Sequence, residues 1–251
     1  MTGFVSLVGA GPGAADLLTV RAVDRLRAAD LVLVDALVAD EVLALAPTAR
    51  RFYVGKRRGR HSIEQEAINR LMIRAARRGD RVVRLKCGDP FVLGRGGEEA
   101  LALEAAGVAY EVVPGLSSAI AAPALAGIPV THRGLSTAFV VASGHAESAY
   151  ATIVDSLAPH SATLVLLMAL ATRGEIAARL VARGWAPTTP AAIVLGASHV
   201  GAARWVGTLA SLGDAPIDTD HPGIVVVGAV VSLAHAIASE HVTLESARNE
   251  A

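Results

Sequence analysis

The chain has 251 residues, 53% of them hydrophobic and 18% charged, and its 23 basic side chains balance its 23 acidic ones. This size and apolar content allow a large core, as one α/β unit or two lobes, whereas zero net charge and few aromatic residues argue against nucleic-acid and anionic-membrane partners. The single cysteine, Cys87, excludes an internal disulfide and favours a reducing compartment.

The first residues, Met1–Phe4, lead directly into an apolar run and lack the basic segment that opens a secretory signal. No apolar run approaches the length needed to span a bilayer. We therefore expect a cytoplasmic protein without a membrane partner.

A glycine-rich loop follows the first predicted strand, Phe4–Val8. Its sequence, Gly9-Ala10-Gly11-Pro12-Gly13-Ala14, matches the fingerprint of dinucleotide-binding folds, and Asp35 ends a second apolar run at a suitable distance. Helical periodicity, however, starts only near Thr19, a predicted N-cap. The helix is then too far from the loop to seat a pyrophosphate, which disfavours a nicotinamide-dependent dehydrogenase.

Basic residues gather in the segment Lys56–His61, after a third predicted strand at Arg51–Val54. Such a segment is either a solvated loop or an anion-binding rim, because Arg and Lys pair well with carboxylate and phosphate. Ser62 and Gln65 have the spacing of a capping box, which predicts the start of a long helix that Gly79 ends.

The segment Val82–Glu99 combines an apolar run, a loop at Gly88-Asp89-Pro90 and the start of a helix predicted over 98–106. Ligands of open α/β sheets bind at the carboxyl ends of strands, so this loop is a candidate binding site. A fifth strand is predicted at Tyr110–Val113. The alternation of strands and helices favours a parallel, doubly wound sheet.

Pro114-Gly115 is the predicted domain boundary, because Pro-Gly breaks regular structure. We expect a first α/β lobe over 1–115, a second over 116–240 and a polar tail over 241–251. The second lobe opens with an alanine-rich helix capped by Ser117 or Ser118. Little helix separates its last three predicted strands, at 191–195, 203–207 and 224–227, so its sheet should be mixed. Without a second cysteine or paired histidines, no metal site is predicted.

Several motifs carry a resemblance to a known family, and they lie at Val8–Gly13, Leu17–Thr19, Val54–Arg57, Val82–Ala100, Val112–Gly115, Ser118–Pro123 and Ala126–Gly134. The chain resembles the uroporphyrinogen-III C-methyltransferases of the tetrapyrrole methylase family. The resemblance implies two α/β lobes with the active site in the cleft between them, and a homodimer. It also implies methyl transfer from S-adenosylmethionine to C2 and C7 of uroporphyrinogen III, giving precorrin-2 for sirohaem and cobalamin synthesis.

The resemblance assigns roles to individual residues. It makes Asp35 a proton acceptor and Lys56 a proton donor. The residues it places against S-adenosylmethionine are Pro12, Cys87, Gly88, Asp89, Val92, Ser117, Ser118, Met168 and Ala197.

The chemistry of such a reaction fits the residues. A substrate rich in carboxylates needs basic rims, which Lys56–His61, Arg84, Arg95 and His132-Arg133 are candidates to supply. The alkylated pyrrole must lose a proton, and Asp35 is the candidate base. Asp35 has an alternative role as a structural hydrogen-bond acceptor.

The chain departs from the family pattern at four places. Cys87 stands where the family has glycine, and Ala36 where an arginine follows the acid. Leu195–Ser198 lacks the usual acid, and Ala202-Ala203 replaces a Gln-Arg pair. Alternative functions are therefore methylation of a later corrin intermediate and non-catalytic tetrapyrrole binding. The length leaves no room for a fused dehydrogenase-chelatase module, so we expect the product to be precorrin-2.

Overall fold

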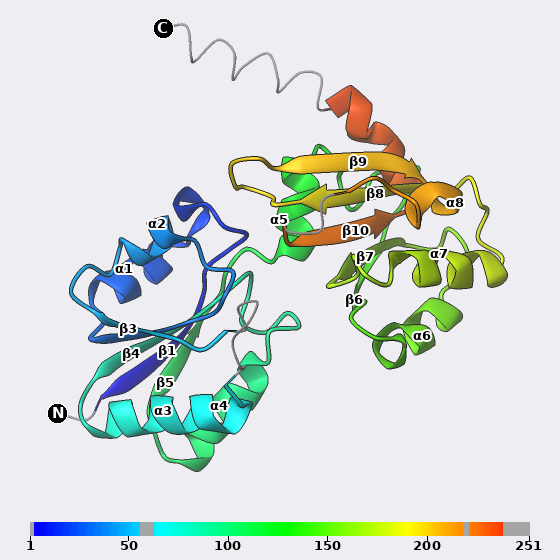
Figure 1. Ribbon diagram of the computed structural model, residues 1–251. Coiled ribbons are helices and arrows are strands. Elements are labelled where there is room, and N and C mark those ends of the chain that lie inside the picture. The colour runs from blue at the N-terminus through cyan, green and yellow to red at the C-terminus, as the bar shows by residue number, and fades with distance from the viewer. Residues whose placement is uncertain (1–2, 56–62, 218–220, 238–251) are drawn as a thin grey trace, which may run out of the picture. The chain divides into compact units, whose positions relative to one another are not determined.

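The computed structural model describes residues 3–55, 63–217 and 221–237. Contacts between Cα atoms divide the chain into two compact units, Met1–Ser117 and Ser118–Ala251. Each unit contains one five-stranded sheet with helices packed on it (Figure 1). The architecture is therefore α/β in both halves of the chain.

The sheet of the first unit has the strand order β3-β2-β4-β1-β5, and all its pairings are parallel. The strands are β1 (Phe4–Gly9), β2 (Leu31–Val34), β3 (Arg50–Tyr53), β4 (Arg81–Lys86) and β5 (Tyr110–Val113). β4 lies between β1 and β2, and all its residues except Arg81 are buried. Its two polar residues, Arg84 and Lys86, are therefore inside the unit.

Helices cover both faces of this sheet (Figure 1). One face packs against α1 (Val20–Arg27) and the short α2 (Asp40–Leu43), with a 3₁₀ helix at Ala15–Leu17 before them. The other face packs against α3 (Gln65–Arg77) and α4 (Gly96–Ala105). Arg84 and Lys86 alternate with Val83 and Leu85 along β4, and since Val83 and Leu85 belong to the α1/α2 core, the two cations point to the α3/α4 face.

The N-cap prediction at Thr19 is confirmed, because its hydroxyl accepts a hydrogen bond from the Ala22 amide at 3.2 Å. The predicted capping box at Gln65 is wrong. Glu64 is the N-cap of α3, and the Gln65 amide binds Asn69 and Glu99 instead. The NH₂ group of Gln65 donates to the buried Glu99 carboxylate, whereas in a capping box the side-chain oxygen of Gln65 would have to accept from the backbone at the helix terminus. Ser62 lies outside the described residues.

The sheet of the second unit has the strand order β6-β7-β10-β8-β9. Only β6 and β7 pair in parallel, and the other three pairings are antiparallel. The strands are β6 (Phe139–Ser143), β7 (Thr163–Leu167), β8 (Pro190–Leu195), β9 (Ala203–Thr208) and β10 (Gly223–Val227). This sheet is mixed.

Helices cover both faces of the second sheet as well. One core contains residues of α6 (Glu147–Ser156), α7 (Arg173–Ala182) and α8 (Leu209–Leu212). The other contains residues of α5 (Ser118–Leu125) and of the 3₁₀ helix at Ala229–Leu233. Throughout residues 3–55, 63–217 and 221–237, no helix combines the length and apolar character needed to cross a membrane.

Candidate active site

The carboxyl ends of β1, β2, β4 and β5 lie at one edge of the first sheet, because these strands are parallel. The loops after β1 and β4 are joined there by a two-residue bridge. The Gly11 amide donates to the Gly88 carbonyl at 3.1 Å, and the Gly88 amide donates to the Gly11 carbonyl at 2.8 Å. The motif containing Pro12 and the loop containing Cys87–Val92 are thus neighbours, although they are far apart in sequence.

Glycines allow the backbone to approach closely at this edge. A Cβ atom built on Gly115 would lie 2.3 Å from the Gly88 carbonyl oxygen and 2.7 Å from the Gly9 Cα. Gly88 has φ of +65°, which a side chain would strain. The three loops therefore meet through backbone atoms, without side chains between them.

Asp89 fixes the arrangement of these loops. Its Oδ1 accepts a hydrogen bond from the Phe91 amide at 2.8 Å, and its Oδ2 accepts one from the Gly115 amide at 3.1 Å. The first bond closes the turn after β4, and the second ties that turn to the segment after β5. Asp89 thus has a clear role inside the protein, whatever it contacts in a ligand.

Asp35 follows β2 at the same edge of the sheet. Its Oδ1 accepts a hydrogen bond from Arg84 Nη2 at 2.6 Å, and 22% of its side chain is exposed. No other hydrogen bond to this carboxylate is found within the described part of the chain. One oxygen of the Asp35 carboxylate is thus held by Arg84, and the carboxylate is still partly exposed to solvent.

The prediction that Arg84 contributes to a basic rim for the substrate is wrong. The Arg84 side chain is 3% exposed and bonds to Asp35, Glu99 and the carbonyls of Leu33 and Leu85. The alternation of β4 points it into the interior, where an unpaired cation would be costly. Arg95 does remain at the surface, where it pairs with Glu98 at 2.8 Å.

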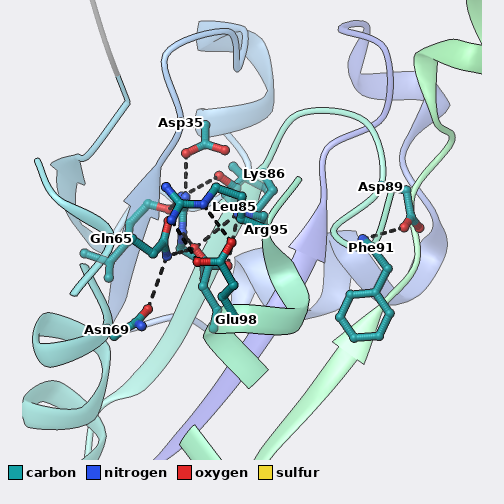
Figure 2. A network of polar contacts seen from close by, with 12 residues as sticks. Asp35, Gln65, Asn69, Leu85, Lys86, Asp89, Phe91, Arg95 and Glu98 are labelled. Atoms are coloured by element: carbon teal, nitrogen blue, oxygen red, sulfur yellow. Dashed lines mark hydrogen bonds and ion pairs between the residues drawn. The ribbon is translucent and has the colours of Figure 1, made fainter. Parts of the chain in front are cut away.

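A polar cluster lies beneath Asp35, on the α3/α4 face of the sheet. Glu99 of α4 is fully buried and accepts hydrogen bonds from Arg84 Nε at 2.8 Å, Lys86 Nζ at 3.1 Å and Gln65 Nε2 at 3.0 Å. Gln65 also donates to Asn69 at 3.2 Å. Figure 2 shows the cluster continuing from Asp35 at one end to Asn69 at the other, with the Asp89–Phe91 contact separate from it.

Two side chains close to Asp35, Arg84 and Cys87, have shifted pKa values. Burial acts to lower the pKa of Arg84, but the carboxylates of Asp35 and Glu99 outweigh it, so the pKa is raised and the guanidinium stays charged. The pKa of the Cys87 thiol is also raised, first by desolvation from the surrounding protein and then by the charge of Asp35. Cys87 is therefore a neutral thiol at neutral pH.

The remaining predicted residues of the first unit are distributed along the same edge. Pro12 and Val92 are partly buried, Gly88 is buried, the Cys87 side chain is exposed, and Ser117 is 7% exposed at the end of the unit. Lys56 and the segment Lys56–His61 lie outside the described residues.

Ser118, Met168 and Ala197 belong to the second unit. Ser118 begins α5, Met168 directly follows β7, and Ala197 is the second residue after β8. Since β7 and β8 both run antiparallel to the strand between them, β10, their carboxyl ends share one edge of this sheet. Met168 has φ of +59° and a side chain that is 51% exposed. Strained residues of this kind often occur at functional sites.

The hydrogen bonds that join Glu99 and Gln65 to β4 and to Asn69 were not predicted from the sequence. One signal was available. Arg84 and Lys86 are two apart on a strand whose other residues are apolar, so they share a buried face, and two buried cations require an acidic partner. The identity of this acidic partner depends on how α4 packs against the sheet, which the sequence does not reveal. Within the described residues, no three His, Cys, Asp or Glu side chains are grouped to hold a metal ion.

The fold and this edge of the first sheet define a class of α/β proteins with a candidate ligand site at the strand ends. Comparison with known proteins identifies the family within this class. Residues 5–213 match the family of tetrapyrrole (corrin/porphyrin) methylases. The chain belongs to this family.

Individual relatives agree. A siroheme synthase of Neisseria meningitidis is 45% identical over 233 residues, which are 92% of this chain and 48% of the relative. The chain thus spans about half the length of the curated relatives it matches. A crystal structure of uroporphyrin-III C-methyltransferase from Thermus thermophilus, complexed with S-adenosyl homocysteine, is 40% identical, with a TM-score of 0.79, 91% of this chain covered and 99% of that one. A cobalt precorrin-4 methyltransferase is 28% identical, with a TM-score of 0.80, 91% of this chain covered and 95% of that one.

Proposed function

We propose that the chain transfers methyl groups from S-adenosylmethionine to C2 and C7 of uroporphyrinogen III and so produces precorrin-2, a precursor of sirohaem and cobalamin. The observation that carries the proposal is the 40% identity to a uroporphyrin-III C-methyltransferase over 99% of that protein's length. That protein was solved with S-adenosyl homocysteine, the product of such a reaction.

The residues of the first unit fit this cofactor. The loops after β1, β4 and β5 meet through glycine backbone, with Gly88 at φ of +65°. Glycine carries no side chain that would block the close approach of the flat ring of an adenosine. The proposed contacts are Pro12, Cys87, Gly88, Asp89, Val92 and Ser117 here, and Ser118, Met168 and Ala197 in the second unit. The Asp89 carboxylate supports this loop by holding Phe91 and Gly115.

When bound, S-adenosylmethionine supplies a methyl group already activated by a sulfonium, so the protein needs neither a nucleophile nor a metal for this step. The chain's task is to align the pyrrole carbon, exclude water and manage protons. We assign Asp35 as the acceptor of the proton that the substrate releases, from an atom other than the methylated one, after a pyrrole carbon is methylated, since its carboxylate is anchored by one oxygen and partly exposed. Lys56 is the proposed proton donor.

The test is mass spectrometry of the product after anaerobic incubation with uroporphyrinogen III and S-adenosylmethionine. We expect the mass increase of two methylations, in each of which the substrate gains a methyl group and loses a proton. A folded chain that binds uroporphyrinogen III without methylating it would instead be a tetrapyrrole carrier. Binding of NAD without binding of S-adenosylhomocysteine would favour a dehydrogenase.

Methylation of a later corrin intermediate is the second candidate. It is favoured by the likeness to a cobalt precorrin-4 methyltransferase, which has a TM-score of 0.80 at 28% identity. An enzyme of this kind would add no methyl group to uroporphyrinogen III but would methylate a precorrin. The higher identity to the Thermus enzyme, at 40%, makes it the weaker candidate.

The proposal includes a cytoplasmic homodimer. The family resemblance supports the dimer. The single cysteine, Cys87, supports a reducing compartment such as the cytoplasm. Light scattering on the purified chain tests the dimer, and a mass equal to one chain would remove that part of the proposal.

A further inference from the structure

Glu99 is a buried carboxylate that the proposed reaction does not use directly. It is 0% exposed, and its oxygens lie within 3.1 Å of Arg84 Nε, Lys86 Nζ and Gln65 Nε2. It comes from the first turn of α4, where the helix dipole favours a negative charge. Three donors from two other elements, β4 and α3, therefore converge on one side chain.

The charges of this cluster balance only when Asp35 is included. Arg84 and Lys86 carry two positive charges, and Glu99 and Asp35 carry two negative ones. Lys86 pairs with Glu99 alone among the described residues, so Arg84 is the group that connects Glu99 to Asp35. Removing the Glu99 charge would leave two buried cations, and Asp35 would be the one anion paired with either of them within the described part of the chain.

The donors of Arg84 fix its direction. Its Nε is held by Glu99, its Nη1 by the Leu33 and Leu85 carbonyls, and its Nη2 by Asp35 at 2.6 Å. The guanidinium is planar, so anchoring the Nε edge sets where Nη2 points. Glu99 thus reaches Asp35 through one rigid group.

We infer that Glu99 is a positioning residue, which holds Arg84 so that Arg84 orients the Asp35 carboxylate toward the substrate. The inference rests on the proposed function, in which Asp35 accepts the proton. Glu99 itself is fully buried and touches no reacting atom. Its effect should therefore appear in turnover, while the glycine loops that are proposed to hold the cofactor stay unchanged.

The experiment separates positioning from charge balance. Glu99→Gln removes the charge and keeps the shape. The double variant Lys86→Met with Glu99→Gln removes one cation and one anion, so the interior stays neutral overall. Glu104→Gln is the control, since Glu104 is an exposed residue of the same helix. For each variant we would measure thermal unfolding, S-adenosylhomocysteine affinity by calorimetry, and kcat and KM with uroporphyrinogen III.

We expect Glu99→Gln to lower kcat by about 10²-fold, as misplacement of a reacting group by about 1 Å does. Affinity for S-adenosylhomocysteine should stay that of the wild type. The double variant should regain thermal stability but keep the low kcat, and Glu104→Gln should behave as wild type.

Recovery of kcat in the double variant would overturn the inference, because Glu99 would then matter only for charge balance. Failure of the double variant to fold would also overturn it, by making Glu99 a stability residue. If the wild-type chain itself methylates nothing, the proposed function fails separately. Crystal structures then decide the inference, and an unchanged Arg84–Asp35 contact in the double variant would contradict it.

Discussion

At the scale of the residue, Asp35 combines two demands on one carboxylate. Its Oδ1 is bound to a buried arginine at 2.6 Å, while the side chain keeps 22% of its surface exposed. A base must be held in position and still reach its proton, and this arrangement satisfies both requirements. It also explains why a purely structural role is a real alternative, since Arg84 needs an acceptor there.

A pair of substitutions separates the two roles. Asp35→Asn keeps an oxygen that Arg84 can bind but removes the base, so we expect kcat to fall by about 10²-fold or more with wild-type affinity for S-adenosylmethionine. Asp35→Ala should also lower the free energy of unfolding, by about 1–3 kcal/mol, because a buried donor of Arg84 loses its partner. Full turnover in Asp35→Asn would make the residue structural.

Cys87 is the second residue whose role can be tested directly. Its raised pKa predicts slow alkylation at pH 8 compared with free cysteine, with the rate still rising above the pH at which free cysteine levels off. Iodoacetamide labelling followed by mass spectrometry measures this, with free cysteine as the reference. A reactive thiol at pH 7 would contradict it.

Cys87→Gly tests the departure from the family pattern. If the thiol crowds the cofactor, the substitution should leave affinity for S-adenosylhomocysteine unchanged or improve it in calorimetry. A large loss of affinity would give the thiol a role of its own.

At the scale of the element, the site depends on three loops held together at one sheet edge. Gly9, Gly88 and Gly115 let their backbones touch, and the Asp89 side chain links the loop after β4 to the segment after β5. Gly9 is the last residue of β1, whereas Gly88, Asp89 and Gly115 lie in loops. The loops therefore keep their shape through a few specific interactions.

Gly115→Ala should disrupt this junction. Its Cβ would lie 2.3 Å from a backbone oxygen, so we expect a loss of about 1–3 kcal/mol in the free energy of unfolding and weaker S-adenosylhomocysteine binding. Gly97→Ala is the matched control, because its Cβ would meet nothing within 4 Å and alanine favours helix α4. Equal stability of the two variants in urea unfolding would show that the loops separate easily.

Asp89→Ala should weaken S-adenosylhomocysteine binding because the amides of Phe91 and Gly115 lose their acceptor. Asp89→Asn keeps one oxygen as an acceptor and should have an intermediate affinity. Unaltered affinity of Asp89→Ala in calorimetry would refute a contribution of Asp89 to the cofactor site.

At the scale of the whole molecule, ion pairs outside the site make stability depend on pH. Hydrogen bonds from Arg179 lower the pKa of Asp155 to about 2, and those from Arg81 lower the pKa of Asp30 to about 2. A lowered pKa in the folded state means that the stabilisation is present above the unfolded value, about 3.9, and disappears as pH falls through the folded one. Both units should thus lose stability between about pH 4 and about pH 2.

Urea unfolding at several pH values tests this in the second unit, which contains both tryptophans, Trp185 and Trp205. Asp155→Asn should reduce the loss of stability on acidification, whereas Asp214→Asn, at an exposed position of the same unit, should not. The same acid dependence in wild type and Asp155→Asn would contradict the prediction.

Local patterns in the sequence were enough to predict most strands and helices. β2 and β5 begin and end where apolar runs predict, and α1 starts at its predicted cap. The short helices at Asp40–Leu43 and Leu209–Leu212 were missed, because four residues are too few to show a helical period. The Gly-rich loops were found because glycine and proline act locally on the backbone.

The sequence by itself thus determined the α/β class, the family resemblance and the loops at the strand ends, since each follows from residues close together in the chain. Only the tertiary structure decided what the charged side chains do. Arg84 meets Glu99 15 residues away and Asp35 49 residues away, and Asp89 meets Gly115 26 residues away. The pairs of Arg84 form because β4 lies beside β2 and α4 packs on the face of the sheet to which Arg84 points. No local sequence pattern determines the order of strands in a sheet.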